Sequence, residues 1–278
     1  MNTTIASPEV SGQHAVIRWN GSQWVLRDLG SRNGTTHNGK VVVSGNDATL
    51  TTGDTLCFGG TETIFTLATD GPPSPVAVSG DRIREGDGEL LALPEPDNPI
   101  AIVDADGNGG WMVRQGQATR SVVSGDVLNV GDISWTLDLP EILDLTVEAK
   151  TSNSITDATI AFRVSADEEY VEVHVNMDGV TTPLKPRAQH YVLLTLARQR
   201  QADADEGLSQ AEQGWLTMQQ LEKMLRATSN QVYVSLHRIR KEFKQFDVAD
   251  ASDIIEKRGT TRQVRIGTDH LQVTRLGE

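Results

Sequence analysis

At 278 residues the chain is long enough for two or three domains that each bury a hydrophobic core. Its net charge of −13 is unevenly distributed: residues 1–182 contain 10 Lys and Arg against 26 Asp and Glu, whereas residues 183–278 contain 15 against 12. A single cysteine, Cys57, excludes an internal disulfide framework, and no apolar run approaches the roughly 18 residues of a membrane helix. We therefore expect a soluble, cytoplasmic protein, not in a membrane, whose two halves bind different partners.

Residues 14–67 alternate short β-prone runs with turn signals, which predicts an all-β domain. Within it, Asn33-Gly34 and Asn38-Gly39 favour positive φ angles and so predict two tight turns. Ahead of these turns, Ser11 and His14 form an S-x-x-H pattern.

The two blocks VSGQHA and DLGSRNGTTHNGK together resemble the forkhead-associated (FHA) domain, a β-sandwich that binds phosphothreonine. A phosphate dianion needs several donors held on rigid turns, because charge-assisted hydrogen bonds depend on a preformed geometry. The resemblance implies that Ser11, Arg32 and Asn33 contact the phosphopeptide. It also implies a scaffold of His14, Gly34, Asn38 and Gly39.

The chain departs from the family pattern ahead of the first block. FHA domains normally carry a Gly-Arg pair there, whose arginine is the main phosphate ligand, yet no arginine precedes Arg18. Three explanations stay open: a true start upstream of Met1, a sheet completed from elsewhere in the molecule, or loss of phosphate binding.

Three prolines within five residues predict an extended linker over residues 71–80, after an FHA domain over residues 1–70. Residues 81–140 then repeat features of the first domain, because Trp111 matches Trp24 and Gly125-Asp126 matches Gly53-Asp54. The SRNGTTHNG segment has no counterpart in this repeat. We therefore expect a degenerate FHA-like β-domain that lacks the phosphate-binding loops.

Residues 141–278 mix β-prone runs, beginning with LTVEAK, with three helical patterns. In the third, NQVYVSLHRIRKEFKQF, one stripe is apolar and should face a core: Val232, Leu236, Ile239 and Phe243. The opposite face is polar and basic: Asn230, Gln231, Val234, His237, Arg238 and Lys241. A basic hairpin, IIEKRGTTRQVRIG, follows.

This region resembles the winged-helix output domain of OmpR/PhoB-type response regulators, with VYVSLHRIRKEF as the recognition helix and EKRGTTRQVRI as the wing. The resemblance implies a helix in the major groove of double-stranded DNA, where Arg238 reaches a guanine and Gln231 an adenine. The phosphate backbone would be held by Asn230, His237, Lys241, Arg258 and Arg262. A homodimer on DNA is a further expectation.

No catalytic chemistry, cofactor or metal is expected, because the six histidines show no metal-ligand spacing and no catalytic motif is present. The predicted fold is multidomain: all-β FHA-like sandwiches followed by an α+β winged helix-turn-helix domain with an N-terminal antiparallel sheet. The predicted function is a transcription regulator that recognises a threonine-phosphorylated protein, such as a Ser/Thr kinase or its substrate, and binds promoter DNA. The alternative is a phosphoprotein-binding adaptor whose winged helix docks protein.

Overall fold

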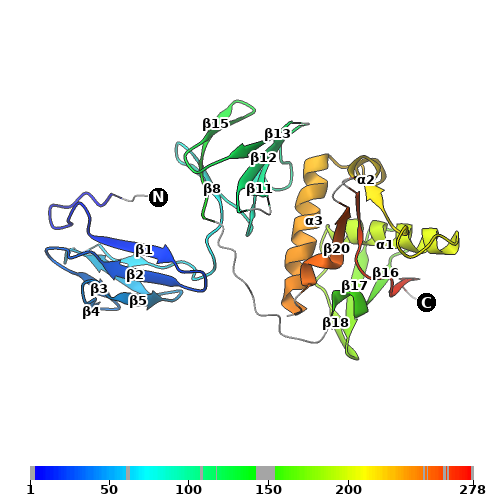
Figure 1. Cartoon of the computed structure of the whole chain (residues 1–278), viewed down its shortest axis with the longest axis horizontal. Coiled ribbons are helices and arrows are strands. Elements are labelled where there is room, and N and C mark those ends of the chain that lie inside the picture. The colour runs from blue at the N-terminus through cyan, green and yellow to red at the C-terminus, as the bar shows by residue number, and fades with distance from the viewer. Residues whose placement is uncertain are drawn as a thin grey trace. The chain divides into compact units, whose positions relative to one another are not determined.

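The computed structural model describes residues 4–60, 63–106, 109–116, 118–141, 154–246, 248, 250–258, 261 and 263–276. The chain divides into two compact units. One comprises Met1–Leu91, Asp104–Trp111 and Ser121–Leu145, and the other comprises Ala92–Val103, Met112–Arg120 and Thr146–Glu278. Figure 1 labels the three helices and many of the strands of the two units. In the described part of the chain, no helix is long and apolar enough to cross a membrane.

The N-terminal domain is all-β, as predicted, and consists of two antiparallel sheets. One sheet has the order β1-β2-β5: Ala15–Trp19, Trp24–Asp28 and Asp47–Leu50. The other has the order β4-β3-β6-β7: Lys40–Val41, Thr35–His37, Thr55–Phe58 and Phe65–Thr66. Leu26 and Leu50 from the first sheet and Leu56 from the second share one buried cluster, so the sheets pack around a common core.

The predicted turns between these strands are present. Gly34 (φ 78°), Asn38 (φ 50°) and Gly39 (φ 73°) all have the positive φ that the Asn-Gly pairs predict. Asn38 is also held by its side chain, which donates to Asp54 Oδ1 at 2.7 Å and accepts from the N–H of Thr55 at 2.9 Å. The second turn is therefore tied to the neighbouring strand.

The predicted linker is too long, because its second half is a strand. Val76–Ser79 forms β8, in which Ala77 is fully buried. The prolines all precede Val76, so they do not interrupt the ladder that this apolar run forms with its neighbours. The sheet has the order β14-β15-β8-β9: Val127–Val130, Ile133–Asp138, Val76–Ser79 and Arg82–Glu85. A further sheet has the order β10-β11-β12-β13: Leu90–Leu93, Ala101–Ala105, Trp111–Gln115 and Ala118–Val122.

The repeat read from the sequence has a counterpart in hydrogen bonds. The indole N–H of Trp24 donates to the carbonyl of Gly71 at 2.8 Å, and that of Trp111 donates to the carbonyl of Pro140 at 2.9 Å. The two Gly-Asp turns agree as well, since Gly53 donates to Leu67 at 2.9 Å and Gly125 donates to Leu137 at 2.7 Å. The FHA-like assignment of residues 81–140 stays a prediction.

The C-terminal region contains a four-stranded sheet whose three N-terminal strands are antiparallel, as predicted, and whose fourth strand, from the C-terminal end, was not predicted. Its order is β18-β17-β16-β22: Val180–Pro183, Val171–Met177, Thr159–Val164 and Leu271–Arg275. β22, near the end of the chain, forms one edge of this sheet and runs parallel to β16. The predicted strand LTVEAK lies outside the described residues.

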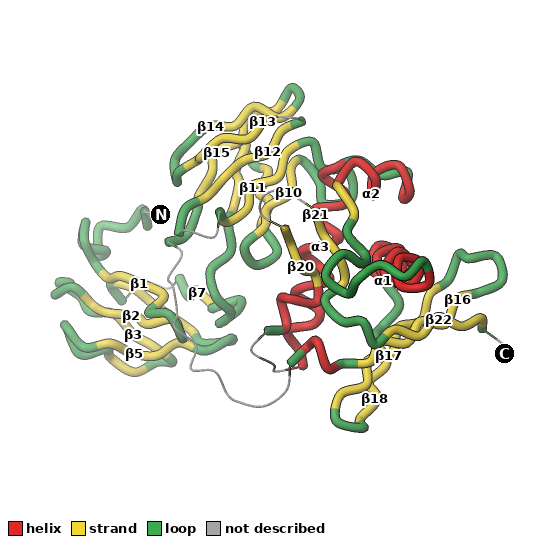
Figure 2. The backbone as a smooth tube through the Cα atoms, turned by 45° about the vertical axis from the view of Figure 1, so that its right-hand side comes forward, coloured by secondary structure: helices red, strands yellow, loops and turns green. Residues whose placement is uncertain are grey.

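Three helices follow the first strands of this region: α1 (His190–Asp205), α2 (Met218–Leu225) and α3 (Ser229–Phe243). Both α2 and α3 begin at a capping box, in which Thr217 pairs with Gln220 and Thr228 with Gln231. A small sheet has the order β19-β21-β20: Leu216–Thr217, Gln263–Ile266 and Ile255–Arg258. Short 3₁₀ turns occur at Ile155–Asp157, Lys244–Phe246 and Ala251–Ile254. Figure 2 distinguishes helices from strands by colour.

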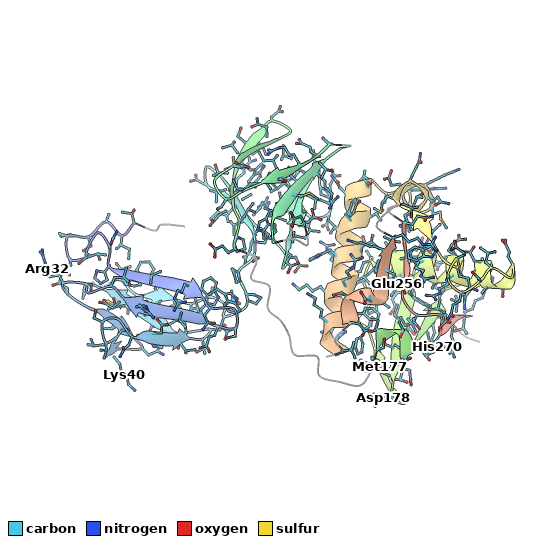
Figure 3. All side chains as sticks on the ribbon, viewed as in Figure 1. Arg32, Lys40, Met177, Asp178, Glu256 and His270 are labelled. Atoms are coloured by element: carbon cyan, nitrogen blue, oxygen red, sulfur yellow. The ribbon has the colours of Figure 1, made fainter. Side chains whose placement is uncertain are left out.

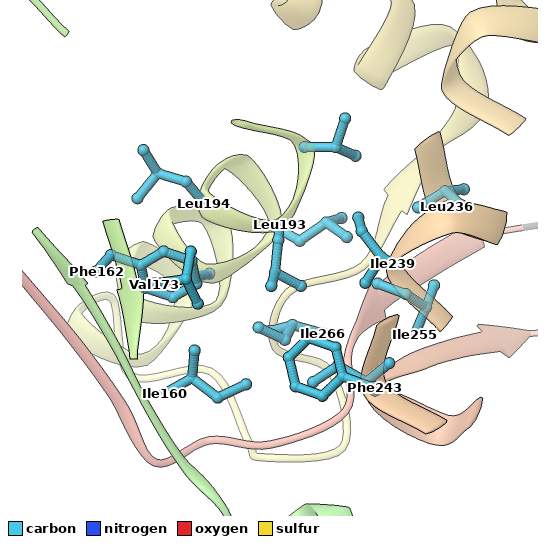
Figure 4. Packing of buried hydrophobic residues seen from close by; sticks show 14 of the residues in the cluster. Ile160, Phe162, Val173, Leu193, Leu194, Leu236, Ile239, Phe243, Ile255 and Ile266 are labelled. Carbon is cyan, nitrogen blue, oxygen red and sulfur yellow. The ribbon is translucent and has the colours of Figure 1, made fainter. Parts of the chain in front are cut away.

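The apolar stripe of α3 faces the core, as its spacing predicts. Val232, Leu236, Ile239 and Phe243 are each at most 1 % exposed and belong to the main buried cluster of this region. Figure 4 shows Leu236, Ile239 and Phe243 packed with side chains from the sheet and from α1.

Candidate functional site

The N-terminal domain brings together the three residues predicted to contact a phosphopeptide. The backbone N–H of Arg32 donates to Ser11 Oγ at 3.2 Å. Asn33 Nδ2 donates to the carbonyl oxygen of Glu9 at 2.9 Å. The loop before β1 and the turn after β2 therefore form one surface, although they lie more than twenty residues apart in sequence.

The His14 side chain joins the two segments that form this surface. Its Nδ1 accepts from the N–H of Ser11 at 2.9 Å, and its Nε2 lies 3.0 Å from the carbonyl oxygen of Gly34. Because Nδ1 is an acceptor, the ring proton belongs on Nε2, where it is donated to Gly34. The imidazole is 7 % exposed and meets the ring of Phe58 edge-on. His14 thus links the loop at Ser11 to the turn at Gly34, while the scaffold roles that the resemblance implies for these residues stay a prediction.

Asp28 is a second anchor, which the sequence analysis missed. Its buried carboxylate accepts four hydrogen bonds: from Ser31 Oγ (2.6 Å), Thr35 Oγ1 (2.7 Å) and the N–H groups of Gly30 (2.9 Å) and Ser31 (3.0 Å). Burial alone would raise the pKa of Asp28, but these hydrogen bonds outweigh it and hold the pKa well below its usual range. The signal in the sequence is an aspartate with a glycine two residues and a serine three residues after it (DLGS), which favours a turn closed by the aspartate side chain.

Asp54 plays a similar part under the second turn. Its carboxylate accepts from Asn38 Nδ2 at 2.7 Å and from the N–H of Thr51 at 2.8 Å, and it pairs with His37 Nε2 at 2.7 Å. The hydrogen bond from Asn38 is the largest of several that keep the pKa of Asp54 well below its usual range. The side chain of Asn38 thus ties the second turn to Asp54 and Thr55, and the scaffold role implied for Asn38 and Gly39 stays a prediction.

Two donors of the surface formed by Ser11, Arg32 and Asn33 are suited to meet a ligand: the Arg32 guanidinium and the Ser11 hydroxyl. Arg32 is exposed and lies at the outer edge of the domain (Figure 3). Ser11 Oγ uses a lone pair on Arg32 N–H, so its own proton is left for a ligand. A guanidinium and a hydroxyl on two rigid turns are suited to an anionic, oxygen-rich group such as a phosphate.

The face of α3 that was predicted to meet DNA is covered over its N-terminal part. Asn230 is 8 % exposed, and its Nδ2 donates to the carbonyls of Pro99 (3.1 Å) and Ile100 (2.9 Å). Val234, on the same face, is 4 % exposed although it lies outside the main core cluster. The helical period places both residues on one side of α3, but it does not indicate that Asn230 meets the carbonyl groups of Pro99 and Ile100.

Gln231 and Arg238 also contact that segment. Gln231 Oε1 closes the capping box at Thr228, while its Nε2 donates to the carbonyl of Asp97 at 3.1 Å. Arg238 lies 3.7 Å from the Asp97 carboxylate. Farther along α3, Lys241 is exposed and His237 is partly exposed.

The hairpin arginines are also engaged within the chain. Arg258 pairs with Glu212 at 3.0 Å, and its guanidinium lies 4.3 Å from the ring centroid of Trp215. Arg265 covers the same indole at 4.4 Å and pairs with Glu256 at 2.8 Å. Arg258 was predicted to hold phosphate, yet here it fastens the loop before β19 to the hairpin. Arg262 lies outside the described residues.

Comparison with known proteins identifies one part of the chain. Residues 1–59 match the family model of the FHA domain. No curated protein and no solved structure gives a significant match. The N-terminal domain is therefore an FHA domain, a class that binds phosphothreonine-containing proteins.

Proposed function

We propose that the protein is a transcription regulator in which Ser11, Arg32 and Asn33 recognise a threonine-phosphorylated protein and the C-terminal region binds DNA as a winged helix. The observation that carries the first part is the pairing of Ser11 and Arg32 across two turns anchored by buried groups. A rigid site loses little entropy on binding, so its donors can contribute to affinity.

Asn33 takes a specific part in this site. Its amide N–H is engaged by Glu9, so its Oδ1 is the atom that accepts an N–H from the bound peptide. The chain would thus hold the peptide backbone with Asn33 and the phosphate with Ser11 and Arg32.

The proposal for the C-terminal region rests on its order of elements. α2 and α3 are separated by three residues and both are capped at the N-terminus, and a hairpin of β20 and β21 follows. A short turn between two helices is the geometry of helix-turn-helix proteins, whose second helix enters the major groove. The partner would be promoter DNA, bound by a homodimer.

Fluorescence anisotropy of a phosphothreonine peptide library, with the unphosphorylated library beside it, tests the first part. Ser11→Ala and Arg32→Ala should each weaken binding by about ten- to a hundredfold, the value of one charged hydrogen bond. Ser22→Ala and Arg18→Ala are matched controls on exposed positions of the same domain and should bind normally. Equal affinity for phosphorylated and unphosphorylated peptides would refute the phosphate site.

A second candidate function, a phosphoprotein-binding adaptor, is favoured by the amide groups of α3, which here bind protein carbonyls. The two functions differ in salt dependence. DNA binding releases counterions and weakens steeply as salt rises, whereas docking of a neutral protein surface does not. Titration of the full-length protein onto a labelled duplex at several salt concentrations separates them.

A further inference from the structure

The loop between β10 and β11 is built to present carbonyl oxygens. Its sequence, PEPDNPI over residues 94–100, contains three prolines, each of which restricts φ and lacks an N–H. The N–H of Ile100 closes the loop by donating to the carbonyl of Leu93 at 2.7 Å. The loop and α3 belong to the same compact unit.

Three carbonyls of this loop are bound by two side chains at the start of α3. Asn230 donates to the carbonyls of Pro99 and Ile100, and Gln231 donates to that of Asp97. Asn230 becomes almost fully buried in doing so. An amide buried in this way contributes to holding the loop, because breaking the contact would leave a polar group unpaired.

Two flanking contacts extend the surface. The guanidinium of Arg114, on β12, lies 4.8 Å from the ring centroid of Tyr233. Arg238 faces Asp97 at 3.7 Å, but the Asp97 side chain is 93 % exposed, so this ion pair contributes little. The side-chain amide hydrogen bonds therefore hold the loop, the Arg114–Tyr233 contact joins β12 to α3, and Asp97 supplies charge complementarity.

The covered face cannot also lie in a DNA groove. The major groove is about 12 Å wide, and a helix with its side chains is about 10 to 12 Å across, so no space remains for a protein loop beside it. The loop and a DNA base would also use the same amide donors of Asn230 and Gln231. Asn and Gln read adenine through acceptor and donor atoms on its edge, and here the loop carbonyls take up the amide donors.

We infer that the loop of residues 94–100 is an internal competitor for DNA, which keeps α3 in a closed state until the loop is displaced. This inference rests on the proposed DNA binding by α3. It explains why residues with DNA-reading chemistry are buried in this conformation. Removal of the loop contacts should therefore raise DNA affinity without altering α3.

The test uses the full-length protein and a labelled mixed-sequence duplex at low salt. Asp97→Arg combined with Arg114→Ala removes both flanking contacts and places a second positive charge opposite Arg238. Asp132→Arg combined with Arg82→Ala makes the same charge change at two exposed positions, one in the turn between β14 and β15 and one on β9, and so corrects for added positive charge. If the double variant folds poorly, Asp97→Arg alone, at a highly exposed side chain, is compared with Asp132→Arg alone, which makes the same charge change.

Hydrogen exchange measured on the same proteins without DNA reports whether the loop is released. We expect faster exchange in residues 97–103 and at least about tenfold tighter DNA binding than in the control variant. If exchange of residues 97–103 is the same in the variant and in the control, the proposed hold of α3 on the loop is refuted. Faster exchange with salt-dependent DNA binding equal to that of the control would refute the inhibition and leave DNA binding standing. No DNA binding by any variant would refute both DNA binding and the inhibition.

Discussion

Gly59 lies so close to the backbone of Glu9 that a Cβ atom at residue 59 would be 2.4 Å from the Glu9 carbonyl oxygen. The same oxygen accepts the amide of Asn33 at 2.9 Å. The N–H of Gly59 donates to the carbonyl of Gly34 at 2.9 Å, beside the His14 contact. The backbone of Gly59 therefore packs directly against the loop before β1, and this contact positions the Glu9 carbonyl for its hydrogen bond with Asn33.

Gly59→Ala should accordingly displace this loop. The new methyl group would overlap backbone atoms of Glu9, which can move only by displacing the whole loop. We therefore expect a loss of about 1 to 3 kcal/mol in the free energy of unfolding and weaker phosphopeptide binding. Gly60→Ala is a matched control, since both glycines have φ of 70° but a Cβ at residue 60 meets nothing within 4 Å. Native-state hydrogen exchange of β1 and peptide anisotropy measure the two effects. Equal behaviour of the two variants would show that the close approach is unimportant.

Asp28 should make the FHA domain sensitive to acid. Its pKa is lowered in the folded state, so its contribution to stability is present above the unfolded pKa, about 3.9, and is lost as pH falls below that value. Asp28→Asn should cost about 1.5 to 3 kcal/mol at neutral pH, because its donors lose a charged acceptor. The difference between the wild type and this variant should shrink below about pH 4.

Hydrogen exchange of β2 at a series of pH values measures this difference. Asp81→Asn, which changes an exposed carboxylate, should leave the opening free energy of β2 unaltered. A constant difference between wild type and Asp28→Asn down to about pH 2 would contradict the assignment.

Arg258 should matter for the fold of the loop before β19. Its contacts with Glu212 and Trp215 are lost in Arg258→Ala, so we expect that loop to open more often. A glutamate-specific protease should then cut faster at Glu206 and Glu212. Lys257→Ala is the control, because successive side chains of a strand point to opposite faces. If the two variants are cleaved at the same rate, Arg258 is not what fastens the loop.

Local patterns in the sequence determined much of the architecture. The Asn-Gly pairs predicted the turns at Gly34 and Gly39 because positive φ is a property of single residues. The spacing of Val232, Leu236, Ile239 and Phe243 predicted the buried side of α3 because the helical period decides which residues share a face. The S-x-x-H and SRNG blocks likewise indicated the FHA domain that residues 1–59 match.

Tertiary structure decided what lies against those elements. The strand β22 completes a sheet begun more than a hundred residues earlier, and no local pattern names its partner. Asn230 has the residue type and the helical position of a DNA contact, yet its donors are bound by carbonyls about 130 residues away in the sequence. Periodicity determines which way a side chain faces, whereas the group that it meets depends on long-range packing, which the order of residues along one helix does not encode.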